Sequence, residues 1–444
     1  MRFRTGGFYV LGSALLAAVI AVPVIAAESP DRIDEAAVAV QQAERISPLA
    51  TDVVTVYNSG PLKQDVADRA LAAARASGAS AAIGRSASIG MTELRRGSTV
   101  VQRPAAGFAL PMGTTVLPLD LIGRTMGRDV SRVLSPNTVV MSSLTASLRG
   151  AKAGDSVDLV ASWGGKVTFK IAAVIDDTIT GGTELLMTPA AADRLGISRL
   201  SRVVIWGFSS RSAIDSAMSK QGLVKTSIRI RKSWDPTDPD FTLGMARTKE
   251  ALGEFSYRVN SNGSVTLDSA WKNKYITLGS VGQLNLPSGC HSTVRVALQA
   301  AMSEVIASGL ENTINYYDAN RAGGCYYPRF NRLTPNSSVG FLSRHSWGMA
   351  IDTNTIGSCQ GCAPPDMNCD TVRIFRKHGF AWGGNFLTPD GMHFEWVGEA
   401  RDQQPYPSRF CPNIVADSSE LQVQQTERAT LYANDGLISG DAQE

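Results

Sequence analysis

The stretches SRHSWGMAID, residues 343–352, and DGMHFEW, residues 390–396, decide how the second half of this chain folds. The chain has four histidines, and two of them, His345 and His393, lie in these stretches, each with an aspartate a few residues away. Imidazole and carboxylate groups are common zinc ligands. We therefore interpret the two stretches as the two halves of one metal site.

The first stretch predicts a bend followed by a short strand. Residues 349–351 are apolar, which is typical of a buried strand, and Asp352 follows at its end. His345 and Asp352 are seven residues apart, which is the wrong parity for one face of a strand. We therefore place His345 on the loop before the strand, where a tight backbone path at Gly348 brings both side chains to one metal.

The second stretch predicts another strand with a turn before it. Residues 392–397 alternate in character, so that His393 and Glu395 share one face. Asp390 lies on the preceding turn. A carboxylate beside a metal-bound water can take its proton and later return it to the leaving amine. Asp390 is our candidate for this base, and Glu395 is the alternative, because the sequence fixes neither side chain's direction.

Together the two stretches predict a catalytic zinc site. Zn²⁺ binds neutral imidazole and carboxylate ligands in a tetrahedron, and a catalytic site uses three protein ligands and keeps one position for water. His345, Asp352 and His393 supply this number and type of ligand. The remaining histidines, His291 and His378, are interpreted as hydrogen-bonded structural residues.

The motifs resemble those of the zinc D-alanyl-D-alanine carboxypeptidase and L-alanyl-D-glutamate endopeptidase family, which includes VanY-like enzymes and phage endolysins. The family pattern Ser-x-His-x-x-Gly-x-Ala-x-Asp matches residues 343–352, Gly-Phe-x-Trp-Gly-Gly matches residues 379–384, and Asp-x-x-His-Phe-Glu matches residues 390–395. A further segment, residues 324–329, is similar to the family's Gly-Cys-Tyr-x-Pro-Arg element. The resemblance extends over roughly residues 252–411.

This resemblance implies a fold, a function and a set of site residues. The implied fold is α+β, with a small antiparallel sheet covered by helices as in hedgehog and D-Ala-D-Ala peptidases. Residues 292–309 have apolar side chains at helical spacing, and this helix should cover the sheet. The implied function is that of an exported zinc metallopeptidase, a hydrolase of peptidoglycan stem peptides. The implied roles are zinc ligands for His345, Asp352 and His393, catalytic acid/base for Asp390, and contact with the substrate or its oxyanion for Arg329.

Two branches of this family cleave different bonds, and the choice between these two bonds stays open. The Asp-x-x-His-Phe-Glu form resembles the endopeptidase branch, because the D,D-carboxypeptidase branch usually has a glutamate at the position of the base. We therefore favour cleavage at an L-Ala–D-Glu or similar bond, with D-Ala-D-Ala carboxypeptidase activity as the alternative. A non-catalytic zinc-containing module that binds the cell wall or a partner is a further alternative, and the presence of Asp390 counts against it.

The N-terminal sequence predicts export. Arg2 and Arg4 precede an apolar run at residues 8–27. Such a run is typical of a signal peptide, but it is also about long enough, at roughly 20 residues, to stay as a membrane anchor. Both alternatives predict an extracytoplasmic protein, either secreted or anchored to the cell membrane. The formal net charge of +3 indicates no nucleic-acid partner.

The first half predicts a second, separate domain. With 444 residues the chain is long enough for two hydrophobic cores. Residues 51–234 alternate strand and helix patterns and contain neither histidine nor cysteine, which predicts a mixed α/β domain. Residues 154–159 and 173–176 loosely resemble the extracytoplasmic domain of ABC-type permeases of the FtsX/MacB kind. That resemblance implies a membrane-protein partner, and a spacer domain is the alternative. The predicted order is a signal or anchor at 1–27, a helical linker at 28–50, this domain, a turn-rich linker at 235–250, the peptidase domain at 251–412 and a disordered tail at 413–444.

All six cysteines lie in the second half and predict disulfides, because an even set in an exported protein is typical of a disulfide framework. The sequence does not rank their pairings. A structural metal site at Cys359, Cys362 and Cys369 is the alternative, although the four-ligand spacing of a zinc module is absent. The insertion that holds these three, residues 357–370, should form a stapled loop on the rim of the cleft.

Overall fold

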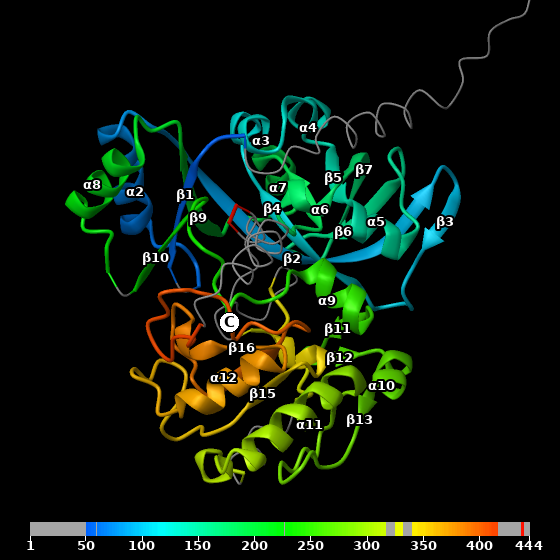
Figure 1. Cartoon of the computed structure of the whole chain (residues 1–444). Helices are drawn as coiled ribbons and strands as arrows, with labels where there is room; N and C mark the ends of the chain where they lie inside the picture. The colour runs from blue at the N-terminus through cyan, green and yellow to red at the C-terminus, as the bar shows by residue number, and fades with distance from the viewer. Residues whose placement is uncertain are drawn as a thin grey trace, which may run out of the picture.

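The computed structural model describes residues 50–58, 60–225, 227–316, 325–331, 340–415 and 437–438. The predicted signal or anchor and the helical linker, up to residue 49, lie outside the described residues. Among the helices that are described, none combines the length and the apolar character needed to cross a bilayer. The described chain forms a larger first half and a smaller second half that lie against each other (Figure 1).

One ten-stranded sheet organises the first half, with β3 paired only to β2. The order of the other strands is β10-β1-β9-β2-β4-β8-β5-β7-β6, and β6 pairs again with β2. β2 is long enough to pair with β9 near its start and with β6 near its end, so that β2, β4, β8, β5, β7 and β6 close into a barrel. The strands are β1 Val53–Asn58, β2 Ser80–Arg96, β3 Thr99–Gln102, β4 Leu110–Val116, β5 Thr138–Ser142, β6 Ser156–Val160, β7 Lys166–Ile175, β8 Leu185–Met187, β9 Leu200–Trp206 and β10 Ile228–Lys232.

Helices cover the open part of this sheet and the ends of the barrel. α2 (Gln64–Ala76) and α8 (Arg211–Lys220) lie side by side over β1, β9 and β10, and their apolar side chains share one cluster with those strands (Figure 1). The barrel interior is filled by apolar side chains such as Ile89, Met112 and Phe169. The shorter helices are α3 Leu119–Thr125, α4 Arg128–Val133, α5 Ser143–Arg149, α6 Asp177–Thr180 and α7 Pro189–Asp193.

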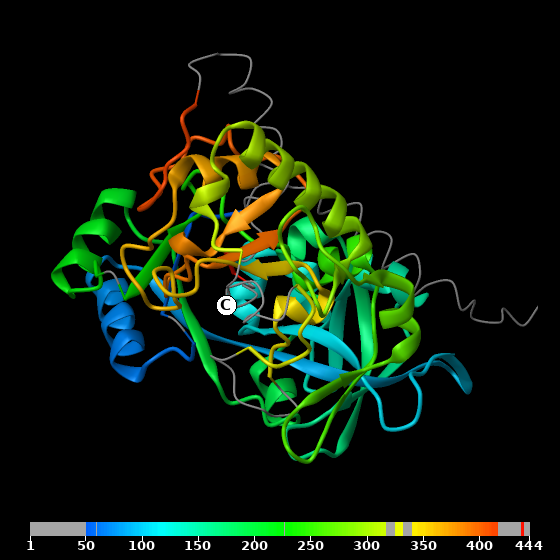
Figure 2. The same cartoon turned by 90° about the horizontal axis from the view of Figure 1, so that it is seen from below.

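The second half is built around a three-stranded antiparallel sheet in the order β15-β17-β16. α12 packs on β16 and α11 packs on α12, and their apolar side chains share one cluster with the sheet (Figure 2). The predicted helix at residues 292–309 forms α11. The elements are α9 Met245–Leu252, β11 Tyr257–Val259, β12 Val265–Leu267, α10 Ser269–Tyr275, β13 Ile276–Thr277, β14 Cys290–His291, α11 Ser292–Ala307, α12 Cys369–Lys377, the strands β15 Ala350–Asp352, β16 Phe380–Trp382 and β17 His393–Trp396, and the 3-10 helices η1 Glu311–Thr313, η3 Arg344–Trp347 and η4 Gly383–Asn385.

The predicted linker at residues 235–250 is not a free connection. Asp240 is 1% exposed, and its carboxylate accepts hydrogen bonds from Arg376 at 2.6 and 2.8 Å and from the side chain of Asn385 at 2.7 Å. The guanidinium of Arg376 is fully buried and needs such a counter-charge. Farther along, α9 runs across the predicted boundary at residue 250. The turn-rich composition therefore marks a segment that packs into the second half.

A buried cluster of four charged side chains joins α9 to the first half. Nζ of Lys249 lies 2.8 Å from Glu184, which precedes β8, and 3.0 Å from Glu254. Arg149, at the end of α5, forms salt bridges with both glutamates. The side chains of Lys249, Arg149 and Glu184 are 0% exposed. Two positive and two negative charges thus compensate each other inside the contact between the halves.

Two residues of the predicted disordered tail are buried. Leu437 and Ile438 join an apolar cluster of the first half that includes Leu121 and Trp206. Oγ1 of Thr55 donates a 2.7 Å hydrogen bond to the carbonyl of Leu437. The prediction of disorder from residue 413 onward is therefore wrong for these two residues, because their apolar side chains gain by burial. Residues 416–436 and 439–444 lie outside the described part.

Disulfides join all six cysteines, as predicted. The pairs are Cys290–Cys325, Cys359–Cys362 and Cys369–Cys411. The alternative of a structural metal site at Cys359, Cys362 and Cys369 is wrong, because all three sulfurs are in disulfide bonds. Such bonds are typical of proteins in oxidising, extracytoplasmic compartments.

Candidate metal centre

The register of β15 and β17 places two of the predicted ligands side by side. Asp352 lies directly opposite His393 in this antiparallel pair. The third, His345, lies on η3 just before β15, where Oγ of Ser343 caps the helix by accepting a 3.3 Å hydrogen bond from the backbone N–H of His345. Gly348 ends η3 with a φ of 63°, and a Cβ there would lie 2.9 Å from a neighbouring backbone nitrogen. The bend therefore requires glycine.

The three predicted ligands converge. The ligand atoms of His345, Asp352 and His393 all lie within 4.8 Å of one another. Oδ2 of Asp352 is 3.4 Å from Nε2 of His345, and Oδ1 is 3.1 Å from Nδ1 of His393. A tetrahedral zinc with bonds of about 2.0–2.2 Å holds its ligand atoms roughly 3.4 Å apart. The spacing and the donor set therefore fit a zinc ion.

The hydrogen bonds of His345 favour a ligand at its Nε2. Nδ1 of His345 lies 3.2 Å from the carbonyl oxygen of Cys325, so Nδ1 carries the proton and donates it. Nε2 then keeps its lone pair and faces Asp352. His345 is 2% exposed, and within the described ranges its Nε2 makes no hydrogen bond. Because a buried polar atom without a partner is costly, this nitrogen is consistent with a metal ligand.

Electrostatics keep Asp352 ionised. Burial raises the pKa of the Asp352 carboxyl, but its electrostatic interactions with the imidazoles of His345 and His393 outweigh burial and hold the pKa well below its usual range. A carboxyl group must be deprotonated to bind a metal. Asp352 is therefore in the state that a metal ligand needs.

A second carboxylate lies behind His393. Oε2 of Glu395 is 3.6 Å from Nε2 of His393, and Oε1 is 3.3 Å from Nε of Arg344. Arg344 in turn donates to Oγ1 of Thr248 at 3.1 Å and to the carbonyl of Leu243. Carboxylates in this position hold a ligating imidazole in one tautomer and orientation. Glu395 is thus placed to orient His393, whereas the sequence left it open as the alternative base.

Replacing Glu395 by glutamine should lower the zinc affinity by about 10- to 100-fold, because the imidazole of His393 loses the charge that orients it. Competition with a chromogenic chelator measures this affinity. The matched control is Glu250→Gln, which changes an exposed glutamate on α9. Excess zinc should restore turnover of the Glu395→Gln protein, and unchanged zinc affinity would contradict the role assigned to Glu395.

Asp390 lies at the edge of the ligand group. It is 5% exposed and lines a small cavity of about 20 Å³ together with Asp352, His393 and Arg329. This volume has room for about one water molecule. A Cβ on Gly383 would lie 2.5 Å from the carbonyl oxygen of Asp390, so the turn that carries this carboxylate rests against glycine. Two of the three predicted ligands, Asp352 and His393, thus line one cavity together with the predicted base.

Arg329 lies at the same cavity, on a segment fastened to the first motif. Its carbonyl accepts a 2.9 Å hydrogen bond from the backbone N–H of Ser343, and its own N–H donates to Oγ of Ser346. Its guanidinium donates to the carbonyl of Phe330 at 3.3 Å. Within the part of the chain that the structure describes, Arg329 forms no salt bridge. A positive charge therefore faces the cavity.

The other two histidines are hydrogen-bonded, as predicted. His291 caps α11 through Nδ1, and its Nε2 donates to the carbonyl of Leu252 at 3.0 Å. His378 lies 2.7 Å from Glu304. Burial lowers the pKa of His291 and so favours its neutral form. The hydrogen bond to Leu252 offsets part of this lowering. Both residues lie outside the metal centre.

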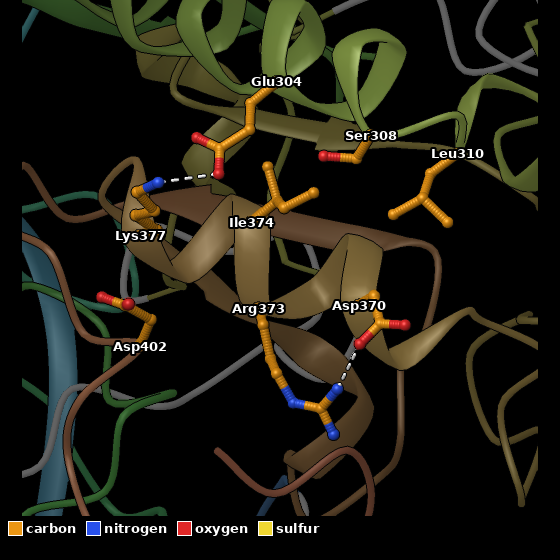
Figure 3. Close-up of a pocket in the computed structure, with 8 residues that line it drawn as sticks. All are labelled: Glu304, Ser308, Leu310, Asp370, Arg373, Ile374, Lys377 and Asp402. Atoms are coloured by element: carbon orange, nitrogen blue, oxygen red, sulfur yellow. Dashed lines mark hydrogen bonds and ion pairs between the residues drawn. The ribbon is translucent and has the colours of Figure 1, made fainter. Parts of the chain in front are cut away.

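A larger hollow between α11 and α12 has a different character. Its volume is about 400 Å³, and its charged side chains pair with each other: Lys377 with Glu304 at 2.7 Å and Arg373 with Asp370 at 2.6 Å (Figure 3). It shares no lining residue with the metal centre. These ion pairs satisfy the charged side chains that line the hollow, so the hollow does not indicate a ligand.

Two imidazoles, one ligand carboxylate and a second carboxylate at a water-sized cavity are the groups of a metal-dependent hydrolase. Part of the chain is also similar to a known protein family. Residues 336–396 match the family described as D-alanyl-D-alanine carboxypeptidase, which confirms the resemblance of this segment predicted from the motifs and supports a peptidase. Arg329 lies before the matched segment. No curated protein matches the chain.

Proposed function

We propose that this chain is an exported zinc peptidase that cleaves the stem peptides of peptidoglycan. The convergence of His345, Asp352 and His393 beside Asp390, within a segment similar to D-alanyl-D-alanine carboxypeptidases, carries this proposal. The chemistry that a bound zinc supplies here is polarisation of the scissile carbonyl and a lower pKa of the attacking water. The three disulfides support export.

The residues around the cavity have different roles in the proposed reaction. Asp390 accepts the proton of the attacking water and returns it to the leaving amine. Its carboxylate lies at the cavity, and Oδ2 accepts a hydrogen bond from Gln360. Arg329 stabilises the substrate or the negative charge that develops on the carbonyl oxygen. Glu395 orients His393 and takes no proton from the water.

The bond we propose is L-Ala–D-Glu or a similar bond within the stem peptide. Aspartate at position 390 supports this choice, as in the endopeptidase branch that the motifs resemble. D-Ala-D-Ala carboxypeptidase activity is the second candidate, because the matched family carries that description. A membrane-protein partner of residues 51–234 stays a prediction that no observation supports.

Digestion of purified muropeptides with mass analysis tests the function. The zinc-loaded protein should cleave the peptides, a chelator should abolish cleavage, and added zinc should restore it. Endopeptidase cleavage leaves L-alanine on the sugar side, whereas carboxypeptidase cleavage releases D-alanine, so the products identify the bond. Peptides that bind without being cleaved would instead favour a non-catalytic binding module. Equal cleavage with and without chelator would refute the zinc mechanism.

A further inference from the structure

The disulfide-closed loop between the two metal motifs reaches the proposed base. Cys359 and Cys362 close a loop of four residues, and Gln360 lies inside it. Nε2 of Gln360 donates a 3.3 Å hydrogen bond to Oδ2 of Asp390. Gln360 is half-buried and lines the same cavity as Asp352, His393 and Asp390. This contact joins an insertion in the chain to the side chain that would move the proton.

Backbone contacts hold the loop and the turn of Asp390 together. Gln360 and Asp390 form an isolated antiparallel bridge, and the N–H of Gly361 donates to the carbonyl of Pro389 at 2.6 Å. On the other side, the N–H of Met392 donates to the carbonyl of Ser358 at 2.8 Å. The position of Gln360 relative to Asp390 is therefore fixed by bonds on both sides of the contact.

The residues that flank the loop also leave no space at the turn. A Cβ on Gly391 would lie 2.4 Å from Cβ of Pro365 and 3.1 Å from Cβ of Ser358. Within the loop, the N–H of Cys362 donates to the carbonyl of Cys359 at 2.9 Å, in addition to the disulfide between them. Because the packing is this close, a change in the conformation of the loop would also move the turn.

We propose that Gln360 is a positioning residue for Asp390, and that the Cys359–Cys362 disulfide fixes Gln360 for this task. The inference rests on the proposed function. The amide of Gln360 donates to Oδ2 and so holds the carboxylate of Asp390 in one orientation at the cavity. A charge-assisted hydrogen bond of this kind is directional, and a catalytic carboxylate that is misplaced by a fraction of an ångström loses much of its effect. Reducing the disulfide would loosen Gln360, so the rate depends on the redox state of this pair.

Steady-state kinetics of Gln360→Met test the role, because methionine keeps the volume and removes the donor. We expect kcat to fall about 10-fold or more, with KM and zinc affinity unchanged. The matched control is Gln299→Met, an exposed glutamine on α11, which should keep the kcat of the parent protein. Thermal unfolding of each variant shows whether it is folded. A folded Gln360→Met protein with the parent kcat would overturn the inference.

Two combined variants separate positioning from a general loss of structure. In an Asp390→Asn background, Gln360→Met should cause no further loss, because Gln360 acts only through Asp390. A further loss of 10-fold would overturn the inference. The Cys359→Ser/Cys362→Ser protein should show a lowered kcat with unchanged zinc affinity, and adding Gln360→Met should not add its full effect. Multiplying losses would show that the disulfide and Gln360 act separately.

These outcomes are distinct from failure of the proposed function. If chelation and Asp390→Asn leave peptide cleavage unchanged, the zinc mechanism itself fails. If both abolish cleavage while Gln360→Met and the serine variants keep the parent kcat, only the role of the loop fails.

Discussion

Replacing Asp390 by asparagine should lower kcat for peptide cleavage by about 10² to 10⁴-fold. Asparagine has nearly the same shape and can still accept a hydrogen bond from Gln360, but its amide cannot take the proton of the attacking water. Zinc affinity should stay within about twofold of the parent protein, since Asp390 is not one of the three ligands. Muropeptide digestion and a chelator competition measure the two quantities on the same preparation.

The matched control for this prediction is Asp366→Asn. Asp366 is an exposed aspartate on the neighbouring loop, so its replacement removes the same charge close to the site without touching the cavity. This variant should cleave at the parent rate. An Asp390→Asn protein that cleaves as fast as Asp366→Asn would show that another group accepts the proton, and Glu395 would then be tested next.

Replacing Lys249 by methionine should reduce the free energy of unfolding by about 3–5 kcal/mol. The ammonium group of Lys249 lies between Glu184 and Glu254 in the buried charge cluster. Without it, two buried carboxylates share the single positive charge of Arg149. Urea unfolding followed by circular dichroism measures the loss as a lower midpoint.

Lys170→Met provides the comparison, because Lys170 is exposed on β7 and its replacement should change stability by no more than about 0.5 kcal/mol. The double variant Lys249→Met/Glu184→Gln should regain part of the lost stability, since it also removes one of the unpaired negative charges. A single Lys249→Met variant as stable as Lys170→Met would contradict the importance of the cluster.

The convergence of the proposed metal ligands was predictable because the information for it is local. The spacing of His345 and Asp352 excludes one strand face, and the glycine between them allows the bend that the structure shows at Gly348. The alternation in residues 392–397 likewise predicts β17 and the shared face of His393 and Glu395. Motifs of this kind fix which side chains meet, since each contains its own turn and strand.

The surroundings of the ligands were not predictable, because the partners are far apart in the sequence. The carbonyl of Cys325 orients His345 from 20 residues away, and Arg344 pairs with Glu395 from the other motif. Any residue can supply a backbone carbonyl, so the sequence does not reveal that contact. An arginine in a motif likewise does not reveal which carboxylate it pairs with. The even number of cysteines predicted disulfides, but their pairing depends on loops that only the fold brings together.

In the first half, local patterns predicted individual elements and missed their closure. Residues 156–160 and 167–171 alternate in character, which is a local signal for strands, and they form the hairpin of β6 and β7. The second pairing of β2, with β6, joins residues about 65 positions apart and has no local signal. Long-range strand pairing of this kind follows from packing of the whole barrel.

The path from Leu243 and Thr248 through Arg344 to Glu395 has a practical consequence for recombinant work. A fragment that begins at residue 251, where the sequence suggests a domain boundary, would lose Leu243 and Thr248, two residues that accept hydrogen bonds from Arg344. A fragment that begins at residue 235 would keep them but would expose Lys249 without Glu184. The half that holds the proposed metal centre is therefore not a self-sufficient module, and the length of chain that must be expressed to test this centre includes the barrel.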